Sequence, residues 1–397
     1  YRWIMLVLAF VTAFTLHLLL FSYSILVPSV KLEMNLSHAQ AGLIFSTSIL
    51  TIVSLRLPWG ILSDRIGFAA TMKIAMIFIA LSGLYRGFAS SYEALLVSQL
   101  FLGVGFAAIL PCLPKLVHAW FGRKLGFSTG VYAMGFPVGE IAALGLTPYF
   151  LTLTGTWRGA FQLFGVLGLI VSALWWMLGK ESLRSGHESS EWEKRSNVSL
   201  KDGLIAVLKV RETWILVGLC ISAMGIYDTL ITWLPYTLEV RGMEPESAGL
   251  TASLLPLGFL FSGPIIGVLS DKLGSRKPFV LIFGLISGPI VLSVALVSGI
   301  SLWIMAFLTG FSVAGILTMV LTIPTEHPGT SEYIGSSMGL ISSLGNLGPL
   351  VIPIAVGHII DVANSIVYAM VMLAIIAETA FILGMLLKES RATIDRR

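Results

Sequence analysis

The chain has 397 residues, of which 56% are hydrophobic and only 12% are charged. A soluble globular domain carries about 25% charged residues, so this composition, with a mean hydropathy of +0.90, excludes an ordinary soluble domain and indicates a protein that crosses a membrane many times. The formal net charge is only +4, which excludes the dense basic surface that binds nucleic acid. Cys112 and Cys220 both lie in apolar runs, so a disulfide framework is excluded as well.

Long apolar segments follow one another along the whole chain, and each is long enough to cross a hydrocarbon core about 30 Å thick as a helix. The predicted spans cover residues 3–27, 38–62, 70–89, 93–118, 127–150, 157–179, 212–238, 246–268, 278–299, 301–324, 333–357 and 364–387. The first segment is longer than the core of a signal peptide, so we expect it to remain in the mature protein.

One Ser-rich, charged stretch interrupts this series and divides the spans into two sets of six. We expect it to be a cytoplasmic linker. The predicted organisation is an N-terminal six-helix bundle over 1–179, a linker over 180–211, and a C-terminal six-helix bundle with a short tail over 212–397. The sequence therefore predicts an all-α membrane protein of twelve transmembrane helices.

The positions of the basic residues predict the orientation. Most of the 25 Lys and Arg residues fall in the segments on one side of the predicted spans, and such residues are retained on the cytoplasmic side during insertion. Both termini are therefore expected in the cytoplasm, with the protein in the cytoplasmic membrane. Lys31, Arg86, Arg158 and Arg241 fall in the predicted outer loops, and Arg56 alone lies well inside a span.

The two halves repeat in sequence. A shift of 207 positions lays Asp64 on Asp271, and a shift of 209 lays Gly139 on Gly348. Because each half contains an even number of spans, both halves enter the membrane from the same side. The repeat is therefore parallel, about an axis along the membrane normal.

The same short motif closes the second and eighth predicted spans. Its residues are Gly60, Asp64, Arg65 and Gly67 in the first copy and Gly267, Asp271, Lys272, Gly274 and Arg276 in the second. The pair resembles the G-x-L-x-D-R-x-G-R-K signature of the major facilitator superfamily. That resemblance implies the major facilitator fold of two pseudo-symmetric six-helix bundles, alternating access, and a gating role for the motif. An ordinary charged turn is the alternative. The first copy continues Phe68-Ala69-Ala70 where two basic residues are usual, so we expect a weaker latch there.

Arg56 is the strongest candidate for a substrate contact, because a guanidinium inside a span is costly and is usually kept for an anion, a carboxylate or a water-filled path. It lies eight residues before Asp64, about 12 Å along the helix. The string Arg56-Leu-Pro58-Trp-Gly60 is similar to the second-span pattern of nitrate/nitrite porters, which implies an anion-binding arginine. The alternatives are a side chain that reaches back to the headgroups or one paired with an internal carboxylate.

The eleventh span carries a second likeness to the same porters. The run from Gly339 to Gly348 looks like their glycine-rich asparagine signature, which implies that the Asn346 amide donates to an oxyanion. Pro137 stands where the porters carry another Asn, and Gly263 stands where they carry a second Arg. A site with two arginines is therefore not expected, and the pattern lies nearer to the cyanate-permease-like and organic-anion branches.

Two carboxyls at membrane depth, Glu140 and Asp228, are the candidates for proton coupling, with His17 as a third group that could shuttle protons. Burial disfavours the charged form of a carboxyl and so lets it take up a proton. The alternative for each carboxyl is a structural role, satisfied by Arg56, an amide or water, and a lone histidine is more often a core hydrogen-bonding residue. Glu378, in the peripheral twelfth span, is expected to be structural.

Three aromatic residues complete the candidate substrate contacts: Tyr23 on span one, and Trp233 and Tyr236 on span seven. Aromatic belts at the membrane interface are the alternative explanation for them. Span four carries Gln99 where the R-x-x-x-G-x-G motif of proton-driven members has Arg, which argues against a standard proton-coupled drug antiporter.

The predicted function is secondary active transport of a small solute, expected to be an organic or inorganic anion, with proton symport as an option. The sequence carries no P-loop, no metal-spaced His/Cys cluster and no nucleophile elbow, so we expect no enzyme activity, no cofactor and no metal. The expected partners are the substrate and membrane lipids, without nucleic acid, and the expected state is a monomer. The alternatives are efflux of hydrophobic or cationic drugs and a transporter-like receptor or sensor.

Overall fold

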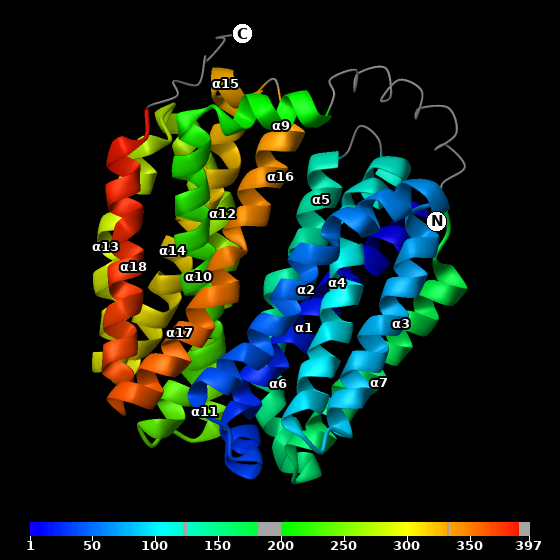
Figure 1. Ribbon diagram of the computed structural model, residues 1–397, viewed down its shortest axis with the longest axis vertical. Helices are drawn as coiled ribbons and strands as arrows, with labels where there is room; N and C mark the ends of the chain where they lie inside the picture. Colours follow the sequence, from blue (N-terminus) through cyan, green and yellow to red (C-terminus); the bar gives the residue numbers. More distant parts are fainter. Residues whose placement is uncertain (122–124, 182–199, 332, 389–397) are drawn as a thin grey trace. The chain divides into compact units, whose positions relative to one another are not determined.

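The computed structural model describes residues 1–121, 125–181, 200–331 and 333–388, and it contains helices and no strand within those ranges. The helices are α1 (Arg2–Met34), α2 (His38–Ile66), α3 (Phe68–Gly87), α4 (Tyr92–Phe121), α5 (Leu125–Ala133), α6 (Gly135–Thr154), α7 (Trp157–Leu178), α9 (Leu200–Leu208), α10 (Arg211–Val240), α11 (Pro245–Ala252), α12 (Leu254–Leu273), α13 (Lys277–Leu296), α14 (Ile300–Glu326), α15 (Pro328–Ser331), α16 (Ile334–Gly345), α17 (Leu347–Ala363) and α18 (Ile366–Leu386) (Figure 1).

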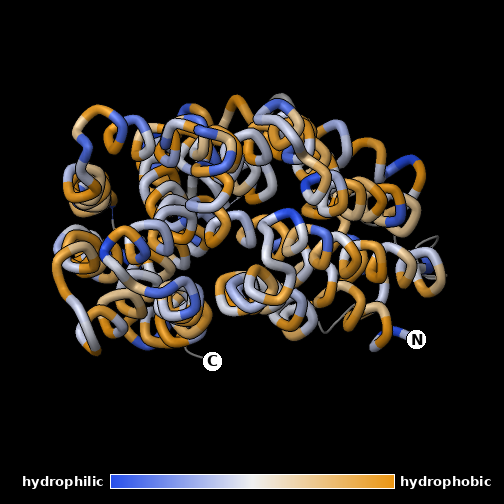
Figure 2. The backbone as a smooth tube through the Cα atoms, turned by 90° about the horizontal axis from the view of Figure 1, so that it is seen from below, coloured by the Kyte–Doolittle hydropathy of each residue, from blue (hydrophilic) through white to orange (hydrophobic). Residues whose placement is uncertain are grey.

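Within these ranges, twelve helical segments are long and apolar enough to cross a membrane, at the places that the sequence predicts. Figure 2 shows hydrophobic residues along most of the helices, with hydrophilic residues in short stretches. Many large apolar side chains point outward, among them Leu153, Met177 and Ile375. A water-soluble helix keeps one polar face, so these outward apolar surfaces are suited to lipid. The predicted all-α, twelve-span fold is confirmed.

The chain divides into two compact units. Unit 1 comprises Tyr1–Lys194 and Leu238–Ser253, and unit 2 comprises Arg195–Thr237 and Leu254–Arg397. Of the predicted linker, residues 182–199 lie outside the described residues, and α9 falls within its remainder. The boundaries 1–179 and 212–397 stay a prediction.

The repeat seen in the sequence is also a repeat of close helix contacts. A Cβ atom added at Gly139 of α6 would overlap the carbonyl oxygen of Phe14 in α1 and lie 3.1 Å from its Cα. In unit 2, a Cβ atom at Gly348 of α17 would overlap the carbonyl oxygen of Ile221 in α10. Phe14 and Ile221 are 207 positions apart, as the sequence repeat requires. Small residues that let two backbones touch therefore occupy equivalent places in both units.

Three of the spans are interrupted, whereas the sequence analysis predicts them to be continuous. The breaks fall at Met134, Ser253 and Asn346. Each lies three residues before a proline, and the preceding helix ends at the fourth residue before that proline. A proline cannot donate to the carbonyl four residues back, and its ring clashes with that carbonyl, which favours a helix end at this place. Other helices, such as α1 at Pro28 and α2 at Pro58, continue through a proline.

The first span runs past its predicted end at residue 27. Helix α1 continues through Pro28 to Met34 and ends where Asn35 takes a left-handed conformation, with φ 51°. Lys31 and Glu33, which follow the predicted end, lie at the end of the helix, where charged side chains can reach water.

Candidate functional site

His17 and Glu140 form a buried pair within unit 1. The Nδ1 atom of His17 lies 2.5 Å from Oε1 of Glu140, and the two side chains are only 18% and 4% exposed. The helices that carry them are held together by the contact of Gly139 with Phe14. Gly139 directly precedes Glu140, and Phe14 lies one helical turn before His17. The close approach of α6 to α1 therefore brings the imidazole and the carboxyl within hydrogen-bonding distance.

Three phenylalanine rings surround the imidazole of His17. The ring centroids of Phe21, Phe106 and Phe136 lie 5.5, 5.6 and 4.7 Å from that of His17. An apolar surrounding strengthens the hydrogen bond between the pair and makes an unpaired charge expensive. The arrangement can hold a proton between an imidazole and a carboxyl, and the loss or gain of that proton changes the charge of the pair.

Unit 2 has no equivalent of this pair. The shift of 207 lays His17 on Met224, and the shift of 209 lays Glu140 on Pro349. Neither Met nor Pro can bind a proton at neutral pH. The glycine packing is therefore shared by both units, whereas the titratable pair belongs to unit 1.

Arg56 lies on α2, and its side chain is partly buried. Among the described residues, no carboxylate forms an ion pair with it and no hydrogen bond of its guanidinium is found. The predicted alternative in which Arg56 pairs with Glu140 is not found among the described ion pairs, in which the Glu140 carboxyl meets His17. The Arg56 guanidinium thus keeps its donors available for a ligand.

The motif at the end of α2 is bound to α4 by a lysine that the sequence analysis missed. Lys115 Nζ donates to Oδ1 of Asp64 at 2.5 Å, to Oγ of Ser63 at 2.6 Å and to the carbonyl of Gly60 at 3.3 Å. Arg65 in the same motif is exposed. Because the Asp64 side chain is 69% exposed, this ion pair is solvated and contributes little to stability.

The motif at the end of α12 is held differently. The guanidinium of Arg276 donates to Asp271 at 2.6 Å, to both carboxylate oxygens of Glu326 at 2.6 and 3.1 Å, and to Ser270 Oγ at 2.6 Å. The hydrogen bonds to Glu326 raise the pKa of Arg276. Burial lowers this pKa, and the hydrogen bond to Asp271 raises it further, so the net direction is upward. Glu326 is the last residue of α14, so Arg276 ties α12 to α14. Gly267 and Gly274 hydrogen-bond only inside the motif, where the Gly267 carbonyl accepts from Ser270 Oγ and the Gly274 N–H donates to the carbonyls of Ser270 and Asp271. Among the ion pairs of the described residues, none includes Lys272.

The first copy of the motif is also covered by a residue from the predicted linker. Gly67 has φ +87°, and a side chain there would collide with the carboxyl of Glu181. Oε1 of Glu181 accepts a hydrogen bond from the backbone N–H of Ala69 at 2.7 Å, and burial raises the pKa of Glu181. The Glu181 carboxylate thus contacts the first turn of α3. The superfamily pattern carries basic residues at that point of the chain.

Of the predicted aromatic contacts, two are buried within their own units. The Tyr23 hydroxyl donates to the carbonyl of Ala41, and Trp233 Nε1 donates to the carbonyl of Pro353. Both side chains are at most 1% exposed. Tyr236 is partly exposed and meets Trp233 edge to face, with ring centroids 5.7 Å apart.

The remaining predicted residues of unit 2 lie on α10 and at the break between α16 and α17. Asp228 is partly buried on α10, beside Tyr227, whose ring contacts Phe259. Asn346 occupies the break, and its Nδ2 donates to the carbonyl of Ser342 at 2.6 Å. One amide hydrogen of Asn346 is therefore engaged within its own segment.

Arg86 is not in an outer loop, as the sequence analysis predicts, but in the last turn of α3, where it is 1% exposed. Its guanidinium donates to the carbonyl of Leu19 at 2.6 Å and to Oε1 of Gln99 at 2.8 Å, and lies 5.4 Å from the ring centroid of Phe161. Gln99 is the residue that replaces the usual Arg of span four. A guanidinium is thus present beside this position, but α3 supplies it.

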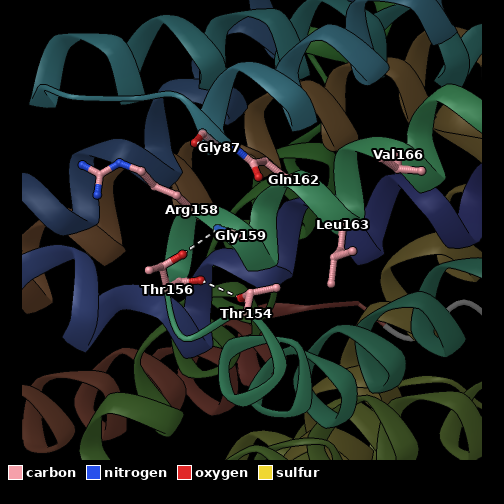
Figure 3. A pocket seen from close by; sticks show the side chains of 8 residues that line it. All are labelled: Gly87, Thr154, Thr156, Arg158, Gly159, Gln162, Leu163 and Val166. Atoms are coloured by element: carbon pink, nitrogen blue, oxygen red, sulfur yellow. Dashed lines mark hydrogen bonds between the residues drawn. The ribbon is translucent and has the colours of Figure 1, made fainter.

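A separate cavity of about 590 Å³ lies between the ends of α3 and α7 (Figure 3). It is lined by Gly87, Thr154, Thr156, Arg158, Gly159, Gln162, Leu163 and Val166. Several of its polar groups form hydrogen bonds with one another. Thr156 Oγ1 accepts a hydrogen bond from the Gly159 N–H, and Thr154 Oγ1 donates one to the Thr156 carbonyl. None of the predicted substrate or proton residues lines this cavity. Within the described part of the chain, no three His, Cys, Asp or Glu side chains gather as a metal would require.

Comparison with known proteins identifies the family. The sequence profile of the Major Facilitator Superfamily matches residues 6–353 and 241–396. The chain is 26% identical over 341 residues to a protein named "Probable 4-methylmuconolactone transporter" from Cupriavidus pinatubonensis, covering 81% of this chain and 78% of that one. It is 24% identical over 365 residues to the "Nitrite extrusion protein" of Bacillus subtilis, covering 91% and 88%.

Two further similarities agree with this family match. The chain is 28% identical over 342 residues to the "3-(3-hydroxy-phenyl)propionate transporter" of Escherichia coli, covering 84% of this chain and 81% of that one. Among solved structures, a bacterial homolog of the human lysosomal transporter Spinster has the same fold, with a TM-score of 0.81 at 18% identity, covering 97% of this chain and 96% of the other. The chain belongs to the Major Facilitator Superfamily.

Proposed function

We propose that this protein is a secondary active transporter that carries a small organic or inorganic anion across the cytoplasmic membrane by alternating access of two bundles, 1–179 and 212–397. The observation that carries the proposal is the division of charge in unit 1. Glu140 is bonded to His17, whereas Arg56 has no carboxylate partner among the described residues. One guanidinium is thus left for an anionic group, and a separate pair is left for a proton.

The names of the relatives support an anionic substrate. Nitrite and a hydroxyphenylpropionate are named for two of those relatives, and a hexuronate is named for a Bacillus subtilis protein that is 25% identical to this chain over 357 residues. All three are anions at neutral pH. A single planar guanidinium binds a carboxylate or nitrite through two parallel hydrogen bonds. Arg56 would provide this contact in unit 1. In unit 2, the second amide hydrogen of Asn346 and the partly exposed Tyr236 are further candidates for binding the substrate.

Proton coupling would pass through His17 and Glu140, with Asp228 as the second candidate. Uptake of a proton by the pair offsets the charge of a monovalent anion, so the transported complex is neutral as a whole. The three rings around His17 and the low exposure of both side chains support this role, because an apolar surrounding strengthens the hydrogen bond of the pair and makes an unpaired charge costly.

Two motif clusters would act as latches at the predicted cytoplasmic ends of α2 and α12. The first is Asp64 with Lys115, and the second is Asp271 and Glu326 with Arg276. The exposed pair of Lys115 with Asp64 is suited to repeated opening, since little free energy is lost when it breaks. Arg276, bonded to Asp271 and Glu326, would hold the end of α12 firmly to α14 throughout the cycle. We further propose a monomer with both termini in the cytoplasm and with no cofactor.

Counterflow in proteoliposomes tests the substrate contact. Nitrite, 3-(3-hydroxyphenyl)propionate and glucuronate are the probes, and Arg56→Gln is the variant. We expect exchange of at least one probe by the parent protein and its loss in Arg56→Gln. The matched control is Lys209→Gln, which removes one exposed positive charge and should exchange normally. Unchanged counterflow in Arg56→Gln, or exchange of tetraphenylphosphonium alone, overturns the anion proposal.

A further inference from the structure

Glu378 is a carboxyl at membrane depth that the proposed transport path does not use. It lies 12 residues after the start of α18 and eight before its end, which places it about 18 Å and about 12 Å from the two ends of that helix. The partner helix at this point is α13, and the two pack side by side in unit 2 (Figure 1). Their contact includes Gly288, which is also near the middle of its helix.

The side chain of Glu378 belongs to the outward face of α18. Val371, Ile375, Ile382 and Met385 of this helix are exposed, and they follow one another at the spacing of a single helical stripe. Glu378 falls in this stripe, three residues after Ile375 and four before Ile382. Since the stripe is otherwise apolar, it faces hydrocarbon in a membrane. Glu378 is therefore a polar interruption of a lipid-facing surface.

The carboxyl is folded against α13. A Cβ atom added at Gly288 would overlap Oε1 of Glu378 and lie 2.8 Å from its Cγ. Gly288 thus leaves a recess in the surface of α13 that the Glu378 side chain fills. This contact explains why Glu378 is half-buried although its stripe is exposed.

No charge near this depth compensates an ionised Glu378. The titratable side chains on the packed helices α13 and α17 are Lys277, His358 and Asp361. Helix α10 also meets α18, through Ser222 and Ile376, and it carries the uncharged Cys220 there. Lys277 begins α13 and donates to the carbonyls of Met385 and Leu387, and the other two lie in the last two turns of α17. Throughout the described ranges, no ion pair to the Glu378 carboxyl is found, and its polar contact is a hydrogen bond with the backbone of Gly288, which supplies no charge.

We propose that Glu378 is a neutral carboxylic acid at the lipid-facing seam of α13 and α18, and that it forms a modification site for lipid-soluble carbodiimides. Without a counter-ion, an ionised carboxylate in hydrocarbon is strongly disfavoured against the protonated acid. The neutral acid is also the form that reacts. The acid proton passes to a carbodiimide nitrogen, a carboxyl oxygen bonds to the central carbon, and the acylisourea rearranges to a stable acylurea. Lipid excludes the water that would otherwise hydrolyse the intermediate.

The test is labelling of the full chain in lipid nanodiscs, followed by peptide mass spectrometry. The probes are N,N′-dicyclohexylcarbodiimide, which enters lipid, and a water-soluble carbodiimide. We expect the first reagent to add its mass to the peptide that contains Glu378 and the second to leave that peptide unmodified. Glu244, which is exposed in the segment between α10 and α11, is the internal control and should react with the water-soluble reagent.

Two outcomes overturn the proposal: absence of label at Glu378 with the lipid-soluble reagent, and equal labelling by both reagents. The variant Glu378→Gln must lose the label and keep anion counterflow, because the site lies outside the proposed transport path. A folded, monodisperse Glu378→Gln protein that has lost counterflow would contradict this separation. The labelling result does not depend on whether the substrate is an anion, so it can fail or succeed independently of the proposed function.

Discussion

His17 Nδ1 and Glu140 Oε1 lie 2.5 Å apart, although the two residues are separated by 123 positions in the chain. The contact depends on the glycine before Glu140, which lets α6 touch the backbone of α1 at Phe14. A packing motif and a titratable pair are thus adjacent on the same two helices. Any change in the spacing of α1 and α6 must alter the distance between the imidazole and the carboxyl.

Replacement of Glu140 separates coupling from binding. Glu140→Gln removes the carboxyl that would accept a proton and keeps its size, so we expect accumulation driven by an inward proton gradient to disappear. Counterflow at equal pH should persist. His17→Gln should shift the pH dependence of uptake in the same measurement. If gradient-driven uptake survives in Glu140→Gln but fails in Asp228→Asn, the coupling site lies on α10 instead.

Filling the contact at Gly139 should loosen unit 1. In Gly139→Ala the new methyl group meets the Phe14 carbonyl, and overpacking of this kind costs about 1–3 kcal/mol. Gly145→Ala is the matched control on the same helix, because nothing lies within 4 Å of its added Cβ. Thermal unfolding in detergent should show a lower Tm for Gly139→Ala than for the parent protein, and an unchanged Tm for Gly145→Ala. Equal Tm values would show that α6 shifts without cost.

The two motif clusters should differ in their contribution to stability. Arg276→Gln leaves the partly buried Glu326 carboxylate without its partner, and breaking a buried pair in this way costs about 3–5 kcal/mol. Lys115→Gln removes an exposed pair, which is worth about 1 kcal/mol or less. Denaturant or thermal unfolding of both variants measures the difference. Similar losses would contradict the assignment of Arg276 as the firm tie between α12 and α14.

Glu181 should make stability weakly dependent on pH. Burial raises the pKa of its carboxyl in the folded protein, so the folded state binds the proton more tightly than the unfolded state does. The stability that this group contributes is complete below its ordinary pKa of 4.5 and is lost as the pH rises through the folded value. We therefore expect the Tm advantage of Glu181→Gln over the parent to grow from pH 4 to neutral pH. A constant difference would contradict the shift.

Much of the fold could be predicted from the sequence, because membrane spans depend on length and hydropathy alone. The repeated motif at Asp64 and Asp271 predicted the superfamily, and this prediction is confirmed. The likeness to nitrite-transporting proteins agrees with one of the named relatives. The breaks at Met134, Ser253 and Asn346 were missed, although a proline three residues later marks each of them. Apolar runs hide such breaks, since hydropathy does not change across them.

The partners of the site residues could not be predicted in the same way. Hydropathy gives the depth of a residue but not the direction in which its helix faces, so neither the bond of His17 to Glu140 nor that of Lys115 to Asp64 followed from the sequence. One signal was present for the first pair. Gly135 and Gly139 mark a face of α6 on which only a backbone fits, and Glu140 adjoins that face. The roles assigned to Arg56 and Asn346 stay predictions.

The prolines behind the three interrupted spans have a mechanical consequence. At each break the hydrogen bond to the fourth residue back is already missing in the folded protein. Bending at Met134, Ser253 or Asn346 therefore strains one backbone bond fewer than bending in a proline-free part of a span, where each broken bond would face lipid. The contacts of Gly139 with Phe14 and of Gly348 with Ile221 lie just beyond two of these points. In these two spans, the segment before the break can therefore bend more easily than the segment after it, which the glycine contact fixes to the neighbouring helix.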